Sequence, residues 1–413
     1  MFFFVQLPSA LFVLLPIFLI SGPFLSDLAI SLIGIIYIIF CLKYKTYSYF
    51  KSKIFIFFVI FCIYIIISSL LNSSDFYSLK SSLFYFRFGI FVGATIFLIE
   101  NNKNLIKLFY FSLLFCFSIL IFDSFLQYFS GQNILGWKSE SNRISSFFGD
   151  EYILGSYLSR LLPILFACAV LLKKQNEQLF LYSLFILFLT EVVVFLSGER
   201  AAFFYINLSA FFILLFIQDH KIKRFITLSL AIITIFIISI FNQNAKERIF
   251  DLTIKQFNIF HEKSNKDKNI YIFSKQHTHH YISAYKMFKD NKVIGVGVKN
   301  FRNKCSEEKY YVSDLSCSTH PHNTYIQFLS ETGFVGFCFI ILALFYVVKY
   351  FLKNLYTKRN QENNFYNFKL CLISSFLITL WPFVPNGNFF NNWLSIIYFL
   401  PVGFFIWCSK NKA

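Results

Sequence analysis

Long apolar runs, separated by short polar segments, recur from one end of the 413-residue chain to the other. Runs of about 17–25 residues can cross the hydrocarbon part of a bilayer as helices, which satisfy all their own backbone groups. The runs lack the two-residue alternation of membrane barrel strands. The pattern predicts an all-α, polytopic integral membrane helix bundle of about twelve transmembrane helices. They cover roughly residues 3–21, 27–42, 54–71, 79–99, 105–129, 153–172, 178–196, 201–217, 224–241, 323–350, 367–382 and 392–408.

The first run contains Pro8 and Pro16 and has neither a basic segment before it nor a small-residue cleavage site after it. We therefore expect it to be the first spanning helix and not a removable signal peptide. No linker or change of composition divides the chain. We expect residues 1–413 to form a single membrane domain.

Composition and charge agree with a membrane protein and suggest its orientation. Hydrophobic residues make up 57% of the chain and charged residues 14%, which excludes an ordinary soluble domain. If the spans alternate in direction, the short segments on the side of both termini hold roughly 16 Lys and Arg, against roughly 4 opposite, so both termini are expected in the cytoplasm. The net charge of +17 is scattered over these segments, and we expect no nucleic acid partner.

On this topology one large periplasmic loop, about residues 242–322, joins spans 9 and 10, and residues 131–152 and 382–393 form smaller outer loops. Long loops in a compact fold usually carry function. Cys305 and Cys317 both lie in the large loop, and in an oxidising periplasm we expect them to form a disulfide.

The most unusual polar segment is HPHN, which contains His320 and His322 and directly precedes an apolar run. If a helix begins there, Asn323, Gln327 and Glu331 line one face of it and descend into the membrane. An ionisable residue inside a span is costly and commonly marks a functional site. Two structural alternatives remain: His322 caps the helix start, and Glu331 belongs to a buried ion pair between helices.

Three arginines are predicted on the same outer side. Arg200 follows Glu199 in the short turn between spans 7 and 8, Arg143 lies in an outer loop, and Arg87 lies within span 4 near its outer end. Guanidinium groups that converge with His322 suit an anionic substrate, above all a phosphate. The structural alternative for Arg200 is a local ion pair with Glu199.

The segment SKQHTHH contains His277, His279 and His280. Three histidines raise the alternative of a metal site, but no cysteine or carboxylate lies at a ligand spacing, and zinc sites need three or four ligands. We therefore expect no metal. A solvated polar loop or phosphate contacts are the remaining interpretations.

The run THPHNTYIQFLSETGFVGF resembles the signature of the bacterial O-antigen ligase and O-antigen polymerase superfamily, with a related core over about residues 180–350. The chain lacks a further arginine that relatives often carry ahead of the GVG segment. His279, His280 or Lys275 are the candidates to replace it. Other segments that resemble the family, in the same order, are PIFLISGPFLSDLAI, RISSFFGDEYILGSYL, SGERAAFF, MFKDNKVIGVGVKNF and NGNFFNNW.

The resemblance implies a metal-independent glycosyltransferase, without cofactor, in the bacterial inner membrane. The donor would be a glycan on undecaprenyl diphosphate, and the acceptor a sugar hydroxyl of lipid A–core or of a growing repeat-unit chain. His322 would be the catalytic base, because imidazole has its pKa near working pH. Arg200, Arg143 and Arg87 would bind the diphosphate. Supporting positions would be His320, Asn323, Gln327, Glu331 and His280.

The sequence does not separate a ligase from a polymerase. A transporter of lipid-linked oligosaccharide, such as a flippase, is the rival from another class, but it predicts two related halves and a charged cavity at mid-membrane. A structural scaffold gives no reason for histidines beside Glu331.

Overall fold

The described part of the chain is all-helical, without a β-strand. The computed structural model describes residues 2–72, 76–139, 143–173, 176–217, 220–258, 273–357 and 364–410. Every predicted span coincides with a helix, which confirms the predicted fold class. These helices are α1 (Phe2–Ile20), α2 (Pro23–Tyr44), α3 (Lys53–Asn72), α4 and α5 (Phe76–Leu83 and Arg87–Asn101, joined by a 3₁₀ turn), α6 (Leu105–Ser130), α7 (Leu154–Leu172), α8 (Glu177–Ser197), α9 (Arg200–Phe216), α10 (Lys221–Phe241), α15 (Thr324–Thr357), α16 (Asn364–Thr379) and α17 (Asn392–Lys410).

Ten helices of the described part are long and apolar enough to cross a membrane, with α4 and α5 counted together. α9 and α16 are shorter, with 17 and 16 residues. α7 is buried along nearly its whole length and packs against α8, α9 and α16, as expected of a helix that is apolar on all sides. Large apolar side chains of α3 and α10 point outward, where lipid would cover them.

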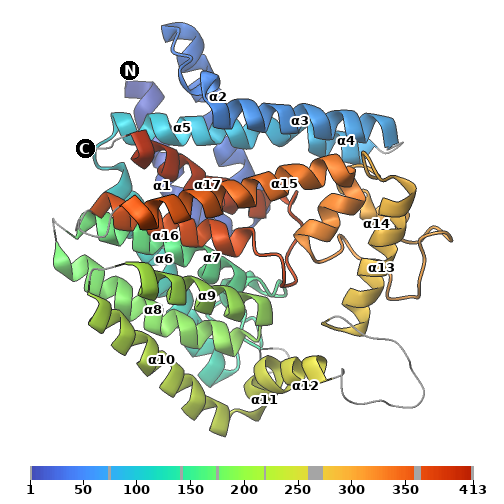
Figure 1. Cartoon of the computed structure of the whole chain (residues 1–413). Coiled ribbons are helices and arrows are strands. Elements are labelled where there is room, and N and C mark those ends of the chain that lie inside the picture. The colour runs from blue at the N-terminus through green and yellow to red at the C-terminus, as the bar shows by residue number, and fades with distance from the viewer. Residues whose placement is uncertain are drawn as a thin grey trace, which may run out of the picture.

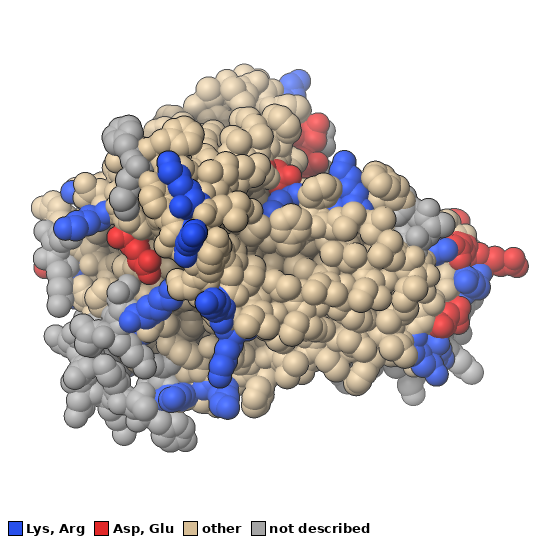
Figure 2. Space-filling model, turned by 90° about the horizontal axis from the view of Figure 1, so that it is seen from above, with Lys and Arg blue, Asp and Glu red and all other residues tan. Residues whose placement is uncertain are grey.

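Charge is distributed unevenly between the ends of the bundle. Figure 1 shows the N- and C-termini at one end and α13 (Lys275–Asp290) with α14 (Phe301–Lys304) at the other. Figure 2 shows mainly Lys and Arg toward the first end, both signs at the second, and a largely uncharged surface between them. We call the end with α13 and α14 the outer end.

The expected continuous helix from residue 323 to 350 is interrupted at Gly333, which has φ 64° and ψ −169°. Residues 324–332 form a short helix of their own, and Figure 1 shows it at a steep angle to the long part of α15. Gln327 and Glu331 therefore lie on the short helix and do not descend along the span. This corrects the prediction from the sequence.

The segment 292–297 stabilises the break, because it supplies partners for the backbone groups that a helix end leaves unpaired. Gly295 and Gly333 permit the contact: a Cβ on Gly333 would lie 2.3 Å from the carbonyl oxygen of Val293, and one on Gly295 would lie 2.4 Å from the backbone of Glu331. Four backbone hydrogen bonds result: Val296 N to Ser330 O (2.9 Å), Gly297 N to Glu331 O (2.9 Å), Phe334 N to Lys292 O (2.7 Å) and Val335 N to Val293 O (3.3 Å).

Candidate active site

The short helix positions the HPHN segment at the outer end of the bundle. Asn323 caps this helix: its side-chain oxygen accepts hydrogen bonds from the backbone N–H groups of Tyr325 (3.0 Å) and Ile326 (3.1 Å), as an N-cap asparagine is expected to do. Its amide also donates to the carbonyl of Pro382. The cap is therefore Asn323 and not His322, which leaves the imidazole of His322 for another role.

Gln327 and Glu331 fasten two outer loops to the short helix. Glu331 accepts a hydrogen bond from the backbone N–H of Phe301 (3.3 Å) and one from the side chain of Gln327 (2.9 Å). Gln327 also donates to the side chain of Asn388 (2.8 Å) and accepts from the backbone N–H of Phe389 (3.0 Å). Both side chains are fully buried. Glu331 is thus held mainly by neutral hydrogen-bond donors, which makes its role positional.

His322 adopts a backbone conformation that L-residues rarely take, with φ 58°. Strained backbone of this kind is common at functional sites, because the surrounding structure has to hold it. Its carbonyl accepts a hydrogen bond from the backbone N–H of Asn386 (2.8 Å). The ring is partly exposed. Burial, with a smaller contribution from His280, lowers the pKa of His322 to about 4, so the imidazole is neutral at pH 7 and can accept a proton.

Three other histidine rings surround His322. The ring centroids lie 4.2 Å from it for His320, 5.3 Å for His280 in a stacked arrangement, and 5.4 Å for His277. Burial is the main cause that lowers the pKa of His277 to about 4 and of His320 to about 3, and it also lowers that of His280. All four rings are therefore neutral at pH 7.

His320 holds the loop in place through both of its ring nitrogens. Its Nε2 lies 2.9 Å from the carbonyl oxygen of Asn386, and its Nδ1 lies 2.9 Å from the hydroxyl of Thr319. A carbonyl only accepts, so Nε2 carries the proton and Nδ1 accepts from the hydroxyl. Asn386 in turn accepts a hydrogen bond from Arg160 of α7 (2.6 Å). This network fixes the histidine loop against the core of the bundle.

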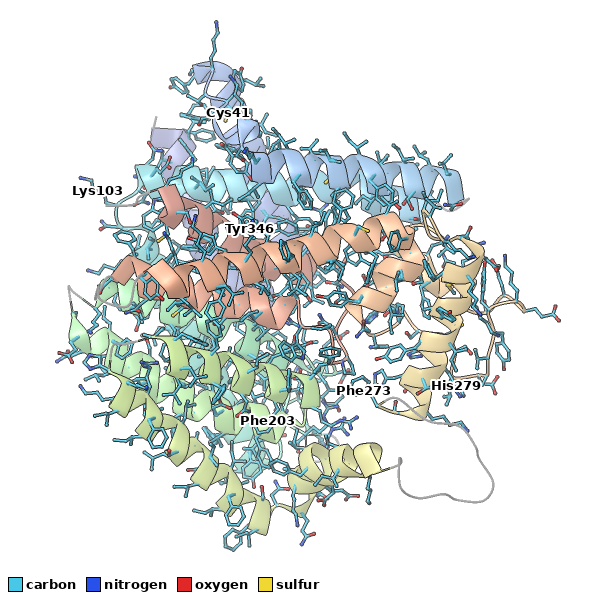
Figure 3. All side chains as sticks on the ribbon, in the orientation of Figure 1. Cys41, Lys103, Phe203, Phe273, His279 and Tyr346 are labelled. Atoms are coloured by element: carbon cyan, nitrogen blue, oxygen red, sulfur yellow. A yellow bond between two sulfur atoms is a disulfide. The ribbon has the colours of Figure 1, made fainter. Side chains whose placement is uncertain are left out.

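The histidines of α13 have separate roles. His277 and His280 face His322, whereas His279 contacts the hydroxyl of Ser313. Figure 3 labels His279 at the outer end, opposite Lys103. In the described residues, no group of three or more His, Cys, Asp or Glu side chains is arranged to hold a metal ion.

A disulfide joins Cys305 and Cys317. It closes a loop of outer residues shortly before His320, as predicted from the position of the two cysteines. The backbone around it is fastened further by Ser316, whose hydroxyl accepts from the backbone N–H groups of Val312 and Ser313.

Three arginines gather at the turn between α8 and α9. Arg143 donates from Nε to the carbonyl of Ser197 (3.0 Å), and Arg248 donates from Nε to the carbonyl of Gly198 (3.0 Å). Gly198 has φ 67°, and a Cβ there would lie 2.7 Å from the Arg248 side chain, so glycine permits this approach. Burial, followed by the charge of Arg248, lowers the pKa of Arg143. Arg200 lies at the first position of α9, close enough to Arg248 for the two charges to interact.

This arginine group, defined here as Arg143, Arg200 and Arg248, adjoins the histidines. After burial and the neighbouring imidazoles, the charge of Arg200 contributes to the lowered pKa of His277. Arg143 and Arg200 were predicted, whereas Arg248 was missed. It lies on a π-helical turn, Glu247–Asp251, inside the segment that the sequence suggests is a loop.

Glu199 binds the N-terminus of α7. Its carboxylate accepts hydrogen bonds from the backbone N–H groups of Gly155 (2.6 Å) and Ser156 (3.0 Å), where a helix N-terminus favours negative charge. Burial raises the pKa of Glu199 to about 7, against the opposing effect of these bonds and of Arg143. Glu199 therefore has a structural task at α7 besides the local ion pair with Arg200 that the sequence suggested.

Arg87 belongs to another group. Its guanidinium forms an ion pair with Asp27 of α2 at 2.7 Å, and its charge acts on Lys299. The sequence predicted a diphosphate contact for Arg87 but did not reveal this partner, because Asp27 lies sixty residues away in the chain.

Residues 183–364 match the family model described as O-Antigen ligase. This match covers less than half of the chain and supports its likeness to the O-antigen ligase and polymerase superfamily. No curated protein matches it. The many apolar helices indicate a multi-pass membrane protein, and the O-antigen ligase match indicates a ligase- or polymerase-type enzyme of the bacterial inner membrane. The matched residues include Arg200, Arg248 and His322, while Arg143 and Asn386 lie outside the match.

Proposed function

We propose that this protein transfers a glycan from undecaprenyl diphosphate to a sugar hydroxyl at the periplasmic face of the inner membrane. The observation that carries the proposal is a neutral, partly exposed imidazole, His322, in a strained loop beside the arginine group. A proton acceptor next to several cations at one end of a helix bundle suits the transfer of a group away from an anionic leaving group.

The reaction needs two kinds of assistance. As the acceptor hydroxyl oxygen bonds to the anomeric carbon, the bond from that carbon to the diphosphate oxygen breaks, and negative charge grows on the lipid diphosphate. Arg143, Arg200 and Arg248 stabilise that charge. His322 takes the hydroxyl proton. One displacement inverts the configuration at the anomeric carbon, and the lipid diphosphate departs with the bonding electrons.

The lowered pKa of His322 couples the base to the donor. Because the pKa of His322 is about 4, its ring is neutral in the free enzyme. The ring can accept a proton but is a weak base. A bound diphosphate brings negative charge close to the ring, and negative charge favours imidazolium. Donor binding therefore raises the pKa of His322 toward the range in which a general base works well.

The orientation is part of the proposal. We infer that both termini are cytoplasmic, since the end with mainly Lys and Arg contains the termini. The outer end, with the disulfide between Cys305 and Cys317, then faces the oxidising periplasm.

The decisive experiment uses purified protein in detergent or nanodiscs with an undecaprenyl-diphosphate-linked glycan and a sugar acceptor, and it detects the new glycosidic bond by mass spectrometry. His322→Ala should abolish product formation, whereas His279→Ala, on the same helix as His277 and His280 but turned toward Ser313, should remain active. Product from His322→Ala at the wild-type rate would overturn the base assignment. In sealed proteoliposomes, movement of the donor across the bilayer without a new bond would indicate a transporter.

Deletion of the gene separates ligase from polymerase. Loss of all long-chain lipopolysaccharide with an intact core indicates transfer to lipid A–core. A band with a single repeat unit indicates transfer to a growing chain.

A further inference from the structure

A second basic group lies beside the segment that directly precedes His320. It consists of Lys299 and Arg302, both placed over one aromatic ring: the Lys299 Nζ is 5.7 Å and the Arg302 Cζ 5.3 Å from the ring centroid of Tyr77. Cations favour the face of an aromatic ring, but two cations that share one ring also repel each other. The structure holds them together all the same.

Lys299 is held in an unfavourable position. Its φ is 57°, a region that suits glycine far better than lysine, and the residue is only 9% exposed. Burial, followed by the charge of Arg302, lowers the pKa of Lys299 to about 8. The next residues fix this conformation, because the Asn300 side chain donates to the carbonyl of Val296 (2.8 Å) and the Phe301 N–H donates to Glu331.

Arg302 has donor capacity left over. Its Nη2 makes a long hydrogen bond of 3.4 Å to the carbonyl of Thr319. Its Nε is buried and has no acceptor among the residues that the structure describes. A buried donor without an acceptor is unfavourable, and native structures pair nearly all of them. The neighbouring carboxylates are already engaged: Asp27 with Arg87, and Glu331 with Phe301 and Gln327.

The two basic groups adjoin different neighbours of the His322 ring. Burial is the main cause of the low pKa of His320, and the charge of Arg302 contributes to it. Arg200 contributes in the same way at His277. The His322 ring contacts both His320 and His277, so one basic group acts on the first of these neighbours and the other group on the second.

We propose that Lys299 and Arg302 form a second anion site, which binds a phosphate group carried by the glycan acceptor. The inference rests on the proposed function, in which the arginine group holds the donor diphosphate. An acceptor anchored at Lys299 and Arg302 would be held apart from the donor diphosphate, with its hydroxyl near His322. A guanidinium with a free Nε–H and an ammonium are suited to a phosphate monoester.

The test compares phosphorylated lipid A–core with the same lipid after phosphatase treatment. For the wild-type enzyme, removal of the phosphate should raise the acceptor KM at least about tenfold, the loss expected for one charge-assisted contact. Arg302→Gln should raise the acceptor KM for the phosphorylated lipid to a similar extent and leave the donor KM unchanged. Arg302→Lys should restore part of the loss. Lys304→Gln is the control. It removes another cation of α14, one that pairs with Glu307, and it should change neither the acceptor KM nor the donor KM.

Inorganic phosphate provides a second probe for any acceptor that supports transfer. Phosphate should inhibit the wild-type enzyme competitively with the acceptor. The Arg302→Gln variant should lose this competitive part of the inhibition. Two results overturn the second site while the proposed function stands. One is a donor KM that rises in Arg302→Gln, and the other is a wild-type acceptor KM that stays the same when the acceptor phosphate is removed. Absence of transfer by the wild-type enzyme to both kinds of acceptor, lipid A–core and a repeat-unit glycan, refutes the proposed function itself. If Arg302→Gln does not fold, the phosphatase comparison on the wild type still decides.

Discussion

Replacement of Gly333 by alanine tests whether the helix break supports the active site. Gly333 has φ 64° and ψ −169°, a region that is essentially confined to glycine and costs other residues about 1–3 kcal/mol. The added Cβ would also lie 2.3 Å from the carbonyl oxygen of Val293, so the segment 292–297 has to move away. That movement strains the hydrogen bonds from Phe334 and Val335, each worth about 0.5–1.5 kcal/mol.

The combined loss is about 2–6 kcal/mol, and the short helix would lose its anchor. Gly131→Ala is the matched control, because Gly131 also has a positive φ, 82°, but a Cβ there meets nothing within 4 Å. We expect thermal unfolding of the detergent-solubilised protein to shift much further for Gly333→Ala than for Gly131→Ala. We also expect Gly333→Ala alone to lose glycan transfer. Equal shifts for the two variants would refute the argument that the contact with Val293 makes the break.

Three further outcomes are expected. Arg200→Lys should reduce the transfer rate at least about tenfold, because an ammonium cannot make the forked contact with a diphosphate; a wild-type rate would exclude that contact. The acid limb of kcat/KM should lie near pH 4, where His322 of the free enzyme gains a proton, and that of kcat should lie higher, since the bound donor raises the pKa; identical limbs would contradict the coupling. Chelators should leave purified enzyme active, because the arginine group supplies the positive charge; loss of activity restored by added zinc would contradict this.

The sequence predicted the helices well, because a run of apolar residues long enough for a bilayer has few alternatives to a helix. The break at Gly333 was not predictable from the same pattern. The apolar run continues through it, and the partners of its unpaired backbone groups lie in the segment 292–297, some forty residues earlier. Only the glycines at positions 295 and 333 hinted at a close backbone contact.

The candidate site was predictable in part. His322 and Arg200 stood out because ionisable groups are rare beside apolar runs. Arg248 and Arg302 did not, since charged residues in a long outer loop look like solvated ones. Asp27 was missed as the partner of Arg87, because ion pairs between distant helices leave no local pattern.

Asn386 connects residues inside the segment that matches the family model with residues outside it. It bonds Arg160 of α7, the ring of His320 and the backbone of His322, yet it lies beyond the matched residues 183–364. A chimera that exchanges only those residues with a relative would combine one protein's histidine loop with another's closing loop. We expect such hybrids to be inactive unless the segment around Asn386 and the start of α7 are exchanged with them.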